Sequence, residues 1–413
     1  MTLLQFGFLA GGERDPGVSA GAFATLPAPV APVVARAASG GWGFALGCGG
    51  QGARGGVGGR SQAGRGGEGE KCGPGGEGRR GRREGFPGGN DDGADPSEVA
   101  EAFPRSLVGL SKSRAPAAAG FDFAVAVTVS GDLAVVSPPA SGPLAWPSAP
   151  SALPSTSASP LAVPLPSPLR GQVAAISAGE THVLLLGRDG TLWAFGRGRD
   201  GQLGTGTADE DELTTPRPVL GPGAGPADDD SAAPSSAPGS ASPVASFSAG
   251  ARHSLASTVS GATFAWGWGA HGQCGSPALD AVAAPRPVAG APGGVAEVAA
   301  GGAHSLLRTG EGHVYAFGRN DAGQLGVSGA SAAEPTLLDP RAFGFRPAVR
   351  VAAGARHSAA LGGVAGGELY TWGDASHGQL GRRGAARAVE RVLGVRGASD
   401  LAAGWWHTLV EIK

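Results

Sequence analysis

The sequence predicts an all-β protein, a β-propeller in which short-stranded units stack around a central axis. The string Ala-Gly-x-x-His occurs five times, and a second string, Gly-Gln-x-Gly, follows the first four histidines after about 20 residues. Glycine is abundant, with 76 of 413 residues, as expected of a chain that turns many tight corners. The repeated residues are His182, His253, His304, His357 and His407, with Gln202, Gln273, Gln324 and Gln379.

Each unit contains a hairpin and one further strand ahead of its histidine. In the first unit an apolar strand at 183–186 and the turn Asp189-Gly190 lead to a strand that ends at Phe195-Gly196. Strands ahead of the histidines are expected at 173–177, 244–248, 295–299 and 349–352. A unit of about fifty residues cannot bury its faces alone, so radial stacking is the expected solution.

The two ends of the chain are expected to complete one sheet. Behind His407 the fifth unit has one strand, at 408–412, but lacks its second half. Near the other end, Phe6-Gly7 stands in the register of Phe195-Gly196. We therefore predict that an N-terminal strand pairs with the C-terminal one, which removes open edges from the ring.

Two further units are degenerate. Residues 119–123 copy the histidine motif with Phe in place of His, and a weaker copy lies at 37–46. Counting both predicts seven blades, with six as the alternative. The chain 1–413 is then one domain, with clear repeats at 172–206, 244–277, 294–328 and 348–382, a closing blade from 398–413 plus 1–13, and degenerate blades near 33–46 and 113–137.

Three segments, 47–98, 138–170 and 207–243, are interpreted as low-complexity insertions. The first is rich in Gly and Arg and has too little apolar surface to fold. Its Arg-Gly-Gly strings at Arg54 and Arg65 resemble RNA-binding boxes, and a solvated spacer is the alternative. The other two are expected to be loops extruded from the ring, because loop-closure entropy grows slowly with length.

Composition narrows the class of protein. A formal net charge of −2 with 16% charged residues disfavours a strongly basic nucleic-acid binder. The three cysteines lie far apart, and no apolar run is long enough to span a membrane. We expect an intracellular monomer in the nucleus or cytoplasm, with an organelle transit peptide left open.

The repeats resemble the regulator of chromosome condensation repeat, whose pattern joins a Gly-x-x-His strand start to Trp-Gly and Gly-Gln-Leu-Gly. Trp266-Gly267 and Trp372-Gly373 match the middle part of that pattern. The resemblance covers about residues 172–413 and implies a β-propeller, commonly seven-bladed. The layout is similar to that of the chromosome-condensation-repeat domain-containing proteins that accompany a histone demethylase-type oxygenase, which implies a chromatin or nuclear partner.

No catalytic residue, metal or cofactor is expected, and the protein is not expected to be an enzyme. The five histidines share one strand start, so we interpret them as structural residues that hydrogen-bond backbone within their own blade. No His-x-x-x-His string or paired Cys supplies metal ligands.

Two candidate surfaces remain. The residues just before the repeated histidines are expected on one face, and Arg and Trp there are typical of interface hot spots. This partner-binding face comprises Glu180, Arg252, Arg356, Trp405 and Trp406. In the alternative, both tryptophans seal the closing blade. The second candidate surface consists of the loops after the aromatic-Gly pairs, with Arg199, Asp200, Trp268, His271, Arg319, Asp321, Asp374 and His377.

The sequence favours a non-enzymatic scaffold that presents a propeller face to a protein partner. The alternative implied by the family is guanine-nucleotide exchange on a Ran-like small GTPase. An ultraviolet-B photoreceptor is a third hypothesis. It is disfavoured because a Gly-Trp-x-His-Thr string occurs once, at Trp405, while the comparable sites carry Ala251-Arg252 and Ala355-Arg356.

Overall fold

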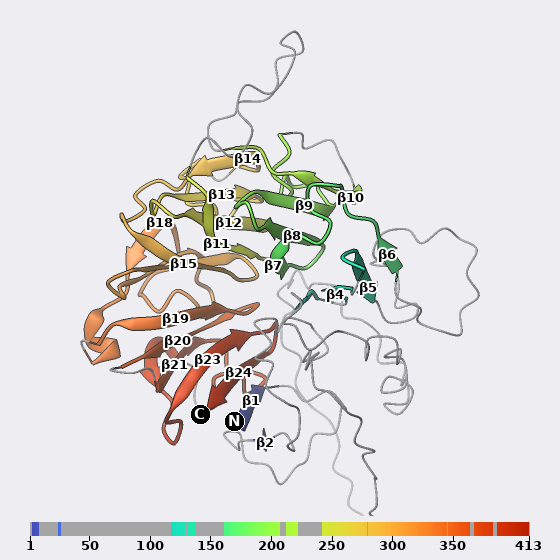
Figure 1. Ribbon diagram of the computed structural model, residues 1–413. Helices are drawn as coiled ribbons and strands as arrows, with labels where there is room; N and C mark the ends of the chain where they lie inside the picture. The colour runs from blue at the N-terminus through green and yellow to red at the C-terminus, as the bar shows by residue number, and fades with distance from the viewer. Residues whose placement is uncertain are drawn as a thin grey trace, which may run out of the picture.

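The computed structural model describes residues 2–7, 24–25, 117–136, 161–206, 212–221 and 242–412, with short gaps at 122, 129, 279, 345, 364–366 and 383–385. These residues form 24 strands in six four-stranded sheets, and all strand pairs are antiparallel. The first strands of neighbouring sheets contact one another, and Figure 1 shows the sheets following one another around the ring. The predicted all-β propeller is confirmed.

Four sheets correspond to the clear repeats, and each repeated histidine begins the second strand of its sheet. The strands expected ahead of the histidines are present as the first strands. The bounds are β7 (Val173–Ala178), β8 (His182–Gly187), β9 (Leu192–Arg197) and β10 (Glu212–Pro218); β11 (Val244–Ala249), β12 (His253–Thr258), β13 (Thr263–Gly267) and β14 (Val282–Pro287); β15 (Val295–Ala300), β16 (His304–Thr309), β17 (Val314–Arg319) and β18 (Ser331–Leu337); β19 (Ala348–Ala353), β20 (His357–Gly362), β21 (Glu368–Gly373) and β22 (Ala386–Arg391).

The fifth sheet joins both ends of the chain, in the order β2-β1-β24-β23. Its strands are β1 (Thr2–Gly7), β2 (Ala24–Thr25), β23 (Ala398–Ala403) and β24 (His407–Ile412). Gly7 pairs with His407, which is the register of Gly196 with His182 in the first repeat. Figure 1 shows the two termini side by side. The predicted closure is confirmed in its register.

The sixth sheet is the degenerate unit expected around residue 120. It contains β3 (Ala117–Ala119), β4 (Ala124–Val127), β5 (Leu133–Val136) and β6 (Leu161–Val163). Phe123, which replaces the histidine, is 1% exposed. The second degenerate copy, near 33–46, lies outside the described residues.

The outer strands correct the expected boundaries. β6 and β10 lie within 138–170 and 207–243, which were expected to be extruded loops, so that interpretation is wrong for these parts. β14, β18 and β22 likewise fall beyond the expected repeat ends. In β10 the sequence Pro216-Arg217-Pro218 conceals the strand, because prolines and charges are tolerated only at a sheet edge.

Aromatic side chains fill the spaces between sheets. Phe195, Trp266, Phe317 and Trp372 are at most 1% exposed. Each precedes a glycine with positive φ, of which Gly267 has φ 100°. A Cβ on Gly267 would lie 2.6 Å from the Arg252 carbonyl oxygen, so the chain can turn here only with glycine. The turn fixes where the next loop leaves the sheet.

The first strands also carry an ion network. Glu297 on β15 accepts from Arg308 Nε at 2.9 Å and lies 3.4 Å from Arg350 Nη1 on β19. Arg350 Nε lies 3.4 Å from Asp400 Oδ1 on β23. Three consecutive sheets are therefore joined by charge as well as by apolar packing. Within the described residues, no helix has the length and apolar character of a membrane span.

Candidate interaction face

Four of the five repeated histidines connect neighbouring sheets. Nε2 of His182 lies 2.8 Å from Oγ of Ser254 in the next sheet, and that hydroxyl donates to the Gln202 carbonyl oxygen at 2.9 Å. Because the single hydroxyl hydrogen goes to the carbonyl, Nε2 must be the donor to Oγ. We call this pair of hydrogen bonds, from a histidine to a hydroxyl and from that hydroxyl to a glutamine carbonyl oxygen, the relay. It recurs in His253–Ser305–Gln273, His304–Ser358–Gln324 and His357–Thr408–Gln379.

This geometry corrects the expected role of the histidines. Within its own sheet His182 contributes only its backbone, where its carbonyl oxygen accepts from Gly179 N at 2.9 Å. The imidazole itself bonds the adjacent sheet, because side chains stand perpendicular to a strand and reach the neighbouring layer. Four of the repeated histidines therefore hold sheets together rather than stabilising a single one.

Burial keeps these imidazoles neutral. Loss of hydration lowers the pKa of His182, His253, His304 and His357 to about 3, and that of His407 to about 4. Among the described residues, no three His, Cys, Asp or Glu side chains gather as metal ligands. The repeated histidines thus serve as neutral hydrogen-bond donors.

The repeated glutamines fix the loops that follow the aromatic-Gly pairs. Oε1 of Gln202 accepts from Asp200 N, and Oε1 of Gln273 accepts from His271 N, both at 2.9 Å. Gln379 holds His377 N in the same way at 2.8 Å. The side chains of the second candidate surface are therefore presented from braced turns.

The two candidate surfaces form one face. Arg252 Nε and Nη2 donate to the two carboxylate oxygens of Asp200, at 2.8 and 2.9 Å, across a sheet boundary. The Arg252 guanidinium carbon lies 5.1 Å from the ring centroid of Trp268, and His271 meets that ring edge-on at 5.0 Å. A residue that precedes a repeated histidine therefore rests on loops of its own sheet and of the preceding one.

The same arrangement recurs one boundary further along. Asp321 Oδ2 lies 2.9 Å from Arg356 Nη2 and 2.7 Å from Arg319 Nη2. Partial burial alone would raise the pKa of Asp321, but the Gln324 hydrogen bond and the two arginine charges outweigh it and lower the pKa. The pKa of His271 is lowered by burial and by the charge of Arg319. Three arginines on this face are thus paired with two carboxylates, which orient them.

The adjacent tryptophans have different neighbours. Trp405 meets Phe121 edge-on at 4.9 Å, a contact between the closing sheet and the β3–β6 sheet. Trp406 packs on His377 at 4.8 Å. The Trp405 contact matches the alternative in which a tryptophan seals the closing blade. We define the cross-sheet face as Asp200, Arg252, Trp268, His271, Arg319, Asp321, Arg356, His377 and Trp406.

Three further expected site residues are Glu180, Arg199 and Asp374. Glu180 is half-buried, and its amide donates to the Gly250 carbonyl oxygen at 3.2 Å. Arg199 is exposed on its loop. Asp374 holds its own loop by accepting from Ser376 N at 3.0 Å and from Ser376 Oγ at 2.9 Å. These residues border the face or stabilise its loops.

Sequence reasoning missed the hydroxyls of the relay, and Asn320, which lies in a loop expected to form part of the second candidate surface, is buried instead. A signal was present for the hydroxyls: Ser or Thr directly follows four of the five repeated histidines, at Ser254, Ser305, Ser358 and Thr408. Asn320 donates to the carbonyl oxygens of Val327 and Gly329, at 2.9 and 2.8 Å. It occurs in one loop only, so no repeat pattern exposes its role.

The fold and the bridged sheet boundaries define a repeat β-propeller with an exposed face of braced loops. The chain belongs to the RCC1-like domain family, whose family model matches residues 6–410. The resemblance to the regulator of chromosome condensation repeat is thereby confirmed.

Two relatives illustrate the range of the family. The chain is 33% identical over 247 residues to the ultraviolet-B receptor UVR8 of Arabidopsis thaliana, covering 58% of this chain and 50% of that protein. It is 34% identical over 173 residues to human RCC1 domain-containing protein 1, covering 32% of this chain and 45% of that protein. The matched region thus spans about half of each relative.

Among solved structures, Prp20p of Saccharomyces cerevisiae superimposes with a TM-score of 0.54 at 21% identity, covering 71% of this chain and 67% of that one. That structure is described together with its binding properties to Gsp1p and histones. At this identity the likeness shows a shared fold.

Proposed function

We propose that this protein is a non-enzymatic interaction scaffold whose cross-sheet face docks a protein partner. The observation that carries the proposal is the Arg252–Asp200 pair beside Trp268, which places a cation, an anion and an aromatic surface in fixed relation. Arg252 and Arg356 are 46% and 44% exposed, so both can still donate to a partner. Arg and Trp are enriched among interface hot spots.

The partner fits a surface of mixed charge. Each arginine already shares a carboxylate, so a partner gains most by offering further acceptors to the guanidinium edge and apolar area to Trp268 and Trp406. Chromatin-associated proteins are the partner class that we favour, in line with the histone binding described for Prp20p. An intracellular monomer in the nucleus or cytoplasm, without a cofactor, belongs to the same proposal.

The test is affinity capture with Arg252→Ala/Arg356→Ala beside the wild type. We expect the double variant to lose partners that the wild type captures from nuclear extract. Arg217→Ala/Arg286→Ala removes two exposed arginines from outer strands and is the matched control. Equal capture by all three proteins would show that the cross-sheet face is not the docking surface.

Exchange of guanine nucleotide on a Ran-like GTPase is the second candidate. It is favoured by the fold shared with Prp20p, whose binding to Gsp1p is described. A nucleotide-release assay with the purified GTPase distinguishes the two functions. Acceleration that depends on Arg252 and Arg356 supports exchange, and an unchanged release rate eliminates it.

Ultraviolet-B sensing is disfavoured by the residues two positions before the repeated histidines. Ala251 and Ala355 stand where that receptor type would repeat its tryptophans, and Trp405 is the one tryptophan at such a position. Size-exclusion chromatography before and after ultraviolet exposure tests this directly. We expect one monomeric elution volume in both conditions, and a light-dependent shift would revive the photoreceptor hypothesis.

A further inference from the structure

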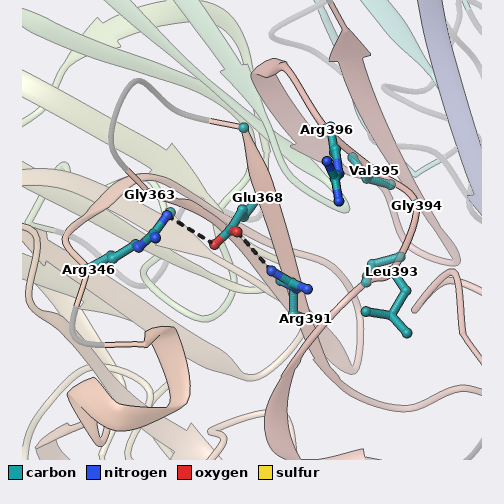
Figure 2. A pocket seen from close by; sticks show the side chains of 11 residues that line it. Arg346, Gly363, Glu368, Arg391, Leu393, Gly394, Val395 and Arg396 are labelled. Carbon is teal, nitrogen blue, oxygen red and sulfur yellow. Dashed lines mark hydrogen bonds and ion pairs between the residues drawn. The ribbon is translucent and has the colours of Figure 1, made fainter.

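A second charged site lies at the opposite end of the strands from the cross-sheet face. A cavity of about 550 Å³ opens between the β20–β21 hairpin and the segment that connects β22 to β23. Figure 2 shows Arg346, Glu368, Arg391, Leu393 and Arg396 around it. We call these five residues the arginine groove. β21 begins at Glu368 in the groove and ends at Gly373 beside the face, so the two sites lie about one strand length apart.

The groove carries excess positive charge. Three arginines surround one carboxylate, which leaves two positive charges at neutral pH. Glu368 accepts from Tyr370 Oη and from Arg391 Nη1, both at 2.9 Å, and lies 3.9 Å from Arg346 Nη1. The Tyr370 hydrogen bond, the bond from Arg391 and the charges of both arginines lower the pKa of Glu368, so the carboxylate stays ionised.

Glu368 orients two guanidinium groups without saturating them. Arg346 and Arg391 are each 50% exposed, and a guanidinium has five N–H donors. Arg396 makes no ion pair with any residue in the described part of the chain. All three arginines can therefore donate hydrogen bonds to further carboxylates, in the bidentate manner that arginine favours.

An apolar contact lies within the same groove. Leu393 is 73% exposed, so its side chain is available for contact with a ligand in the cavity. Gly394, beside Leu393, is exposed and adds no side chain to the lining, so its backbone is accessible to a ligand. The groove thus combines cations, one aliphatic side chain and accessible backbone.

The propeller frame does not require these residues. The equivalent connection between β14 and β15 makes the same backbone bond, Val288 N to Thr263 O at 3.0 Å, as Val392 N makes to Leu369 O at 2.8 Å. That connection reads Ala-Gly-Ala-Pro-Gly-Gly over 289–294, without a charge. Leu393 and Arg396, in the connection from β22 to β23, are therefore not required by the fold, which points to a ligand.

We propose that the arginine groove binds an acidic protein segment in which an aliphatic residue is flanked by Asp or Glu. The partner carboxylates pair with Arg346, Arg391 and Arg396, and the aliphatic side chain packs on Leu393. Charge complementarity favours this occupant, and the exposed leucine and open backbone favour a peptide over a free anion. The site is separate from the cross-sheet face, so it does not depend on the proposed function of that face.

The test uses a fluorescein-labelled peptide Asp-Glu-Leu-Asp-Glu and its amide analogue Asn-Gln-Leu-Asn-Gln in fluorescence anisotropy with the full chain. We expect the acidic peptide to bind at least tenfold more tightly than the amide peptide, with weaker binding at higher salt. Arg391→Glu/Arg396→Glu should abolish the difference, and Leu393→Asp should weaken the acidic peptide. Arg286→Glu and Arg252→Ala/Arg356→Ala are controls that should bind as the wild type.

Folding is checked by thermal unfolding of each variant, and Arg396→Glu alone must lower affinity with an unchanged Tm. Equal binding of the two peptides, or charge reversal without effect, would overturn the proposal. Inorganic phosphate and vesicles containing phosphatidylserine test the other anions. Tighter binding of either probe than of the acidic peptide, lost in the double charge reversal, would assign the groove to phosphate or to membranes and overturn a peptide ligand.

Discussion

Phe123 and Val183 lie at the boundary between the β3–β6 and β7–β10 sheets. At each of the next four boundaries, a histidine stands at the position of Phe123 and a Ser or Thr at the position of Val183. Both side chains are buried in the same apolar cluster. Where the donor is replaced by Phe, the acceptor is replaced by Val, so no polar atom of this pair is left unsatisfied. The two substitutions are therefore physically coupled.

This coupling predicts a double-mutant cycle. Val183→Ser buries a hydroxyl without a histidine partner and should lower the free energy of unfolding by about 1–3 kcal/mol. Phe123→His/Val183→Ser should be more stable than the sum of the two single effects, because His can donate to the new hydroxyl. Urea unfolding measures each value. Strict additivity would show that the two positions do not interact.

Removing one relay hydroxyl should destabilise the protein. Ser305→Ala leaves Nε2 of His253 and the carbonyl oxygen of Gln273 without their partner, at a cost of about 1–3 kcal/mol in unfolding free energy. Ser260→Ala, at an exposed turn, is the control and should change it by less than about 0.5 kcal/mol. Similar values for both variants would mean that the relay contributes little.

Acid should destabilise the fold through the buried histidines. The pKa of His304 falls from 6.5 to about 3 on folding, mainly through burial, so the unfolded chain binds more protons between these values. Stability present above about pH 6.5 is therefore lost as the pH falls toward 3, at about 1.4 kcal/mol per pH unit for each histidine. Unfolding free energies measured between pH 7.5 and 5 should show this slope.

One variant isolates the contribution of a single histidine. His304→Gln should reduce the slope by about one proton. An unaltered slope in His304→Gln would indicate that other groups cause the acid sensitivity.

The ion network on the first strands should stabilise the ring. Glu297 is 17% exposed and binds Arg308 and Arg350, so Glu297→Gln leaves two guanidinium groups without their shared charge. We expect a loss of about 1–3 kcal/mol, below the value for a fully buried pair because solvent reaches Arg350. Glu311→Gln, at an 83% exposed carboxylate, should have almost no effect in the same urea titration. Equal effects would contradict the network.

The repeat strings predict much of the fold because each string marks a fixed corner of a sheet. For example, Gly196 pairs with His182 in the first repeat, and Gly7 pairs with His407 in the same register. The outer strands could not be found this way, because an edge strand such as β10 pairs on one side only and tolerates Pro216 and Arg217. The repeat strings therefore reveal the inner strands of a sheet but not its outer strand.

The candidate face was predicted in two halves and found as one. Arg252 and Asp200 are distant in sequence and meet only because consecutive sheets stack with a particular rotation. No spacing within one repeat encodes that rotation. The groove around Glu368 was not foreseen, because Arg346 precedes β19 whereas Arg391 and Arg396 lie at and beyond the end of β22. Sites between repeats therefore need the structure, whereas sites within a repeat can be found in the sequence.

The pairing of β1 with β24 also determines when the ring can close. During synthesis β1 leaves the ribosome before its partner β24, which follows only after the strands of the five other sheets. Until then β1 keeps an unpaired edge, and the closing contact must join segments about 400 residues apart, which slows folding. The growing chain thus passes through a stage in which this edge can pair with a second copy. Protection of β1 by a chaperone at that stage would favour the closed ring.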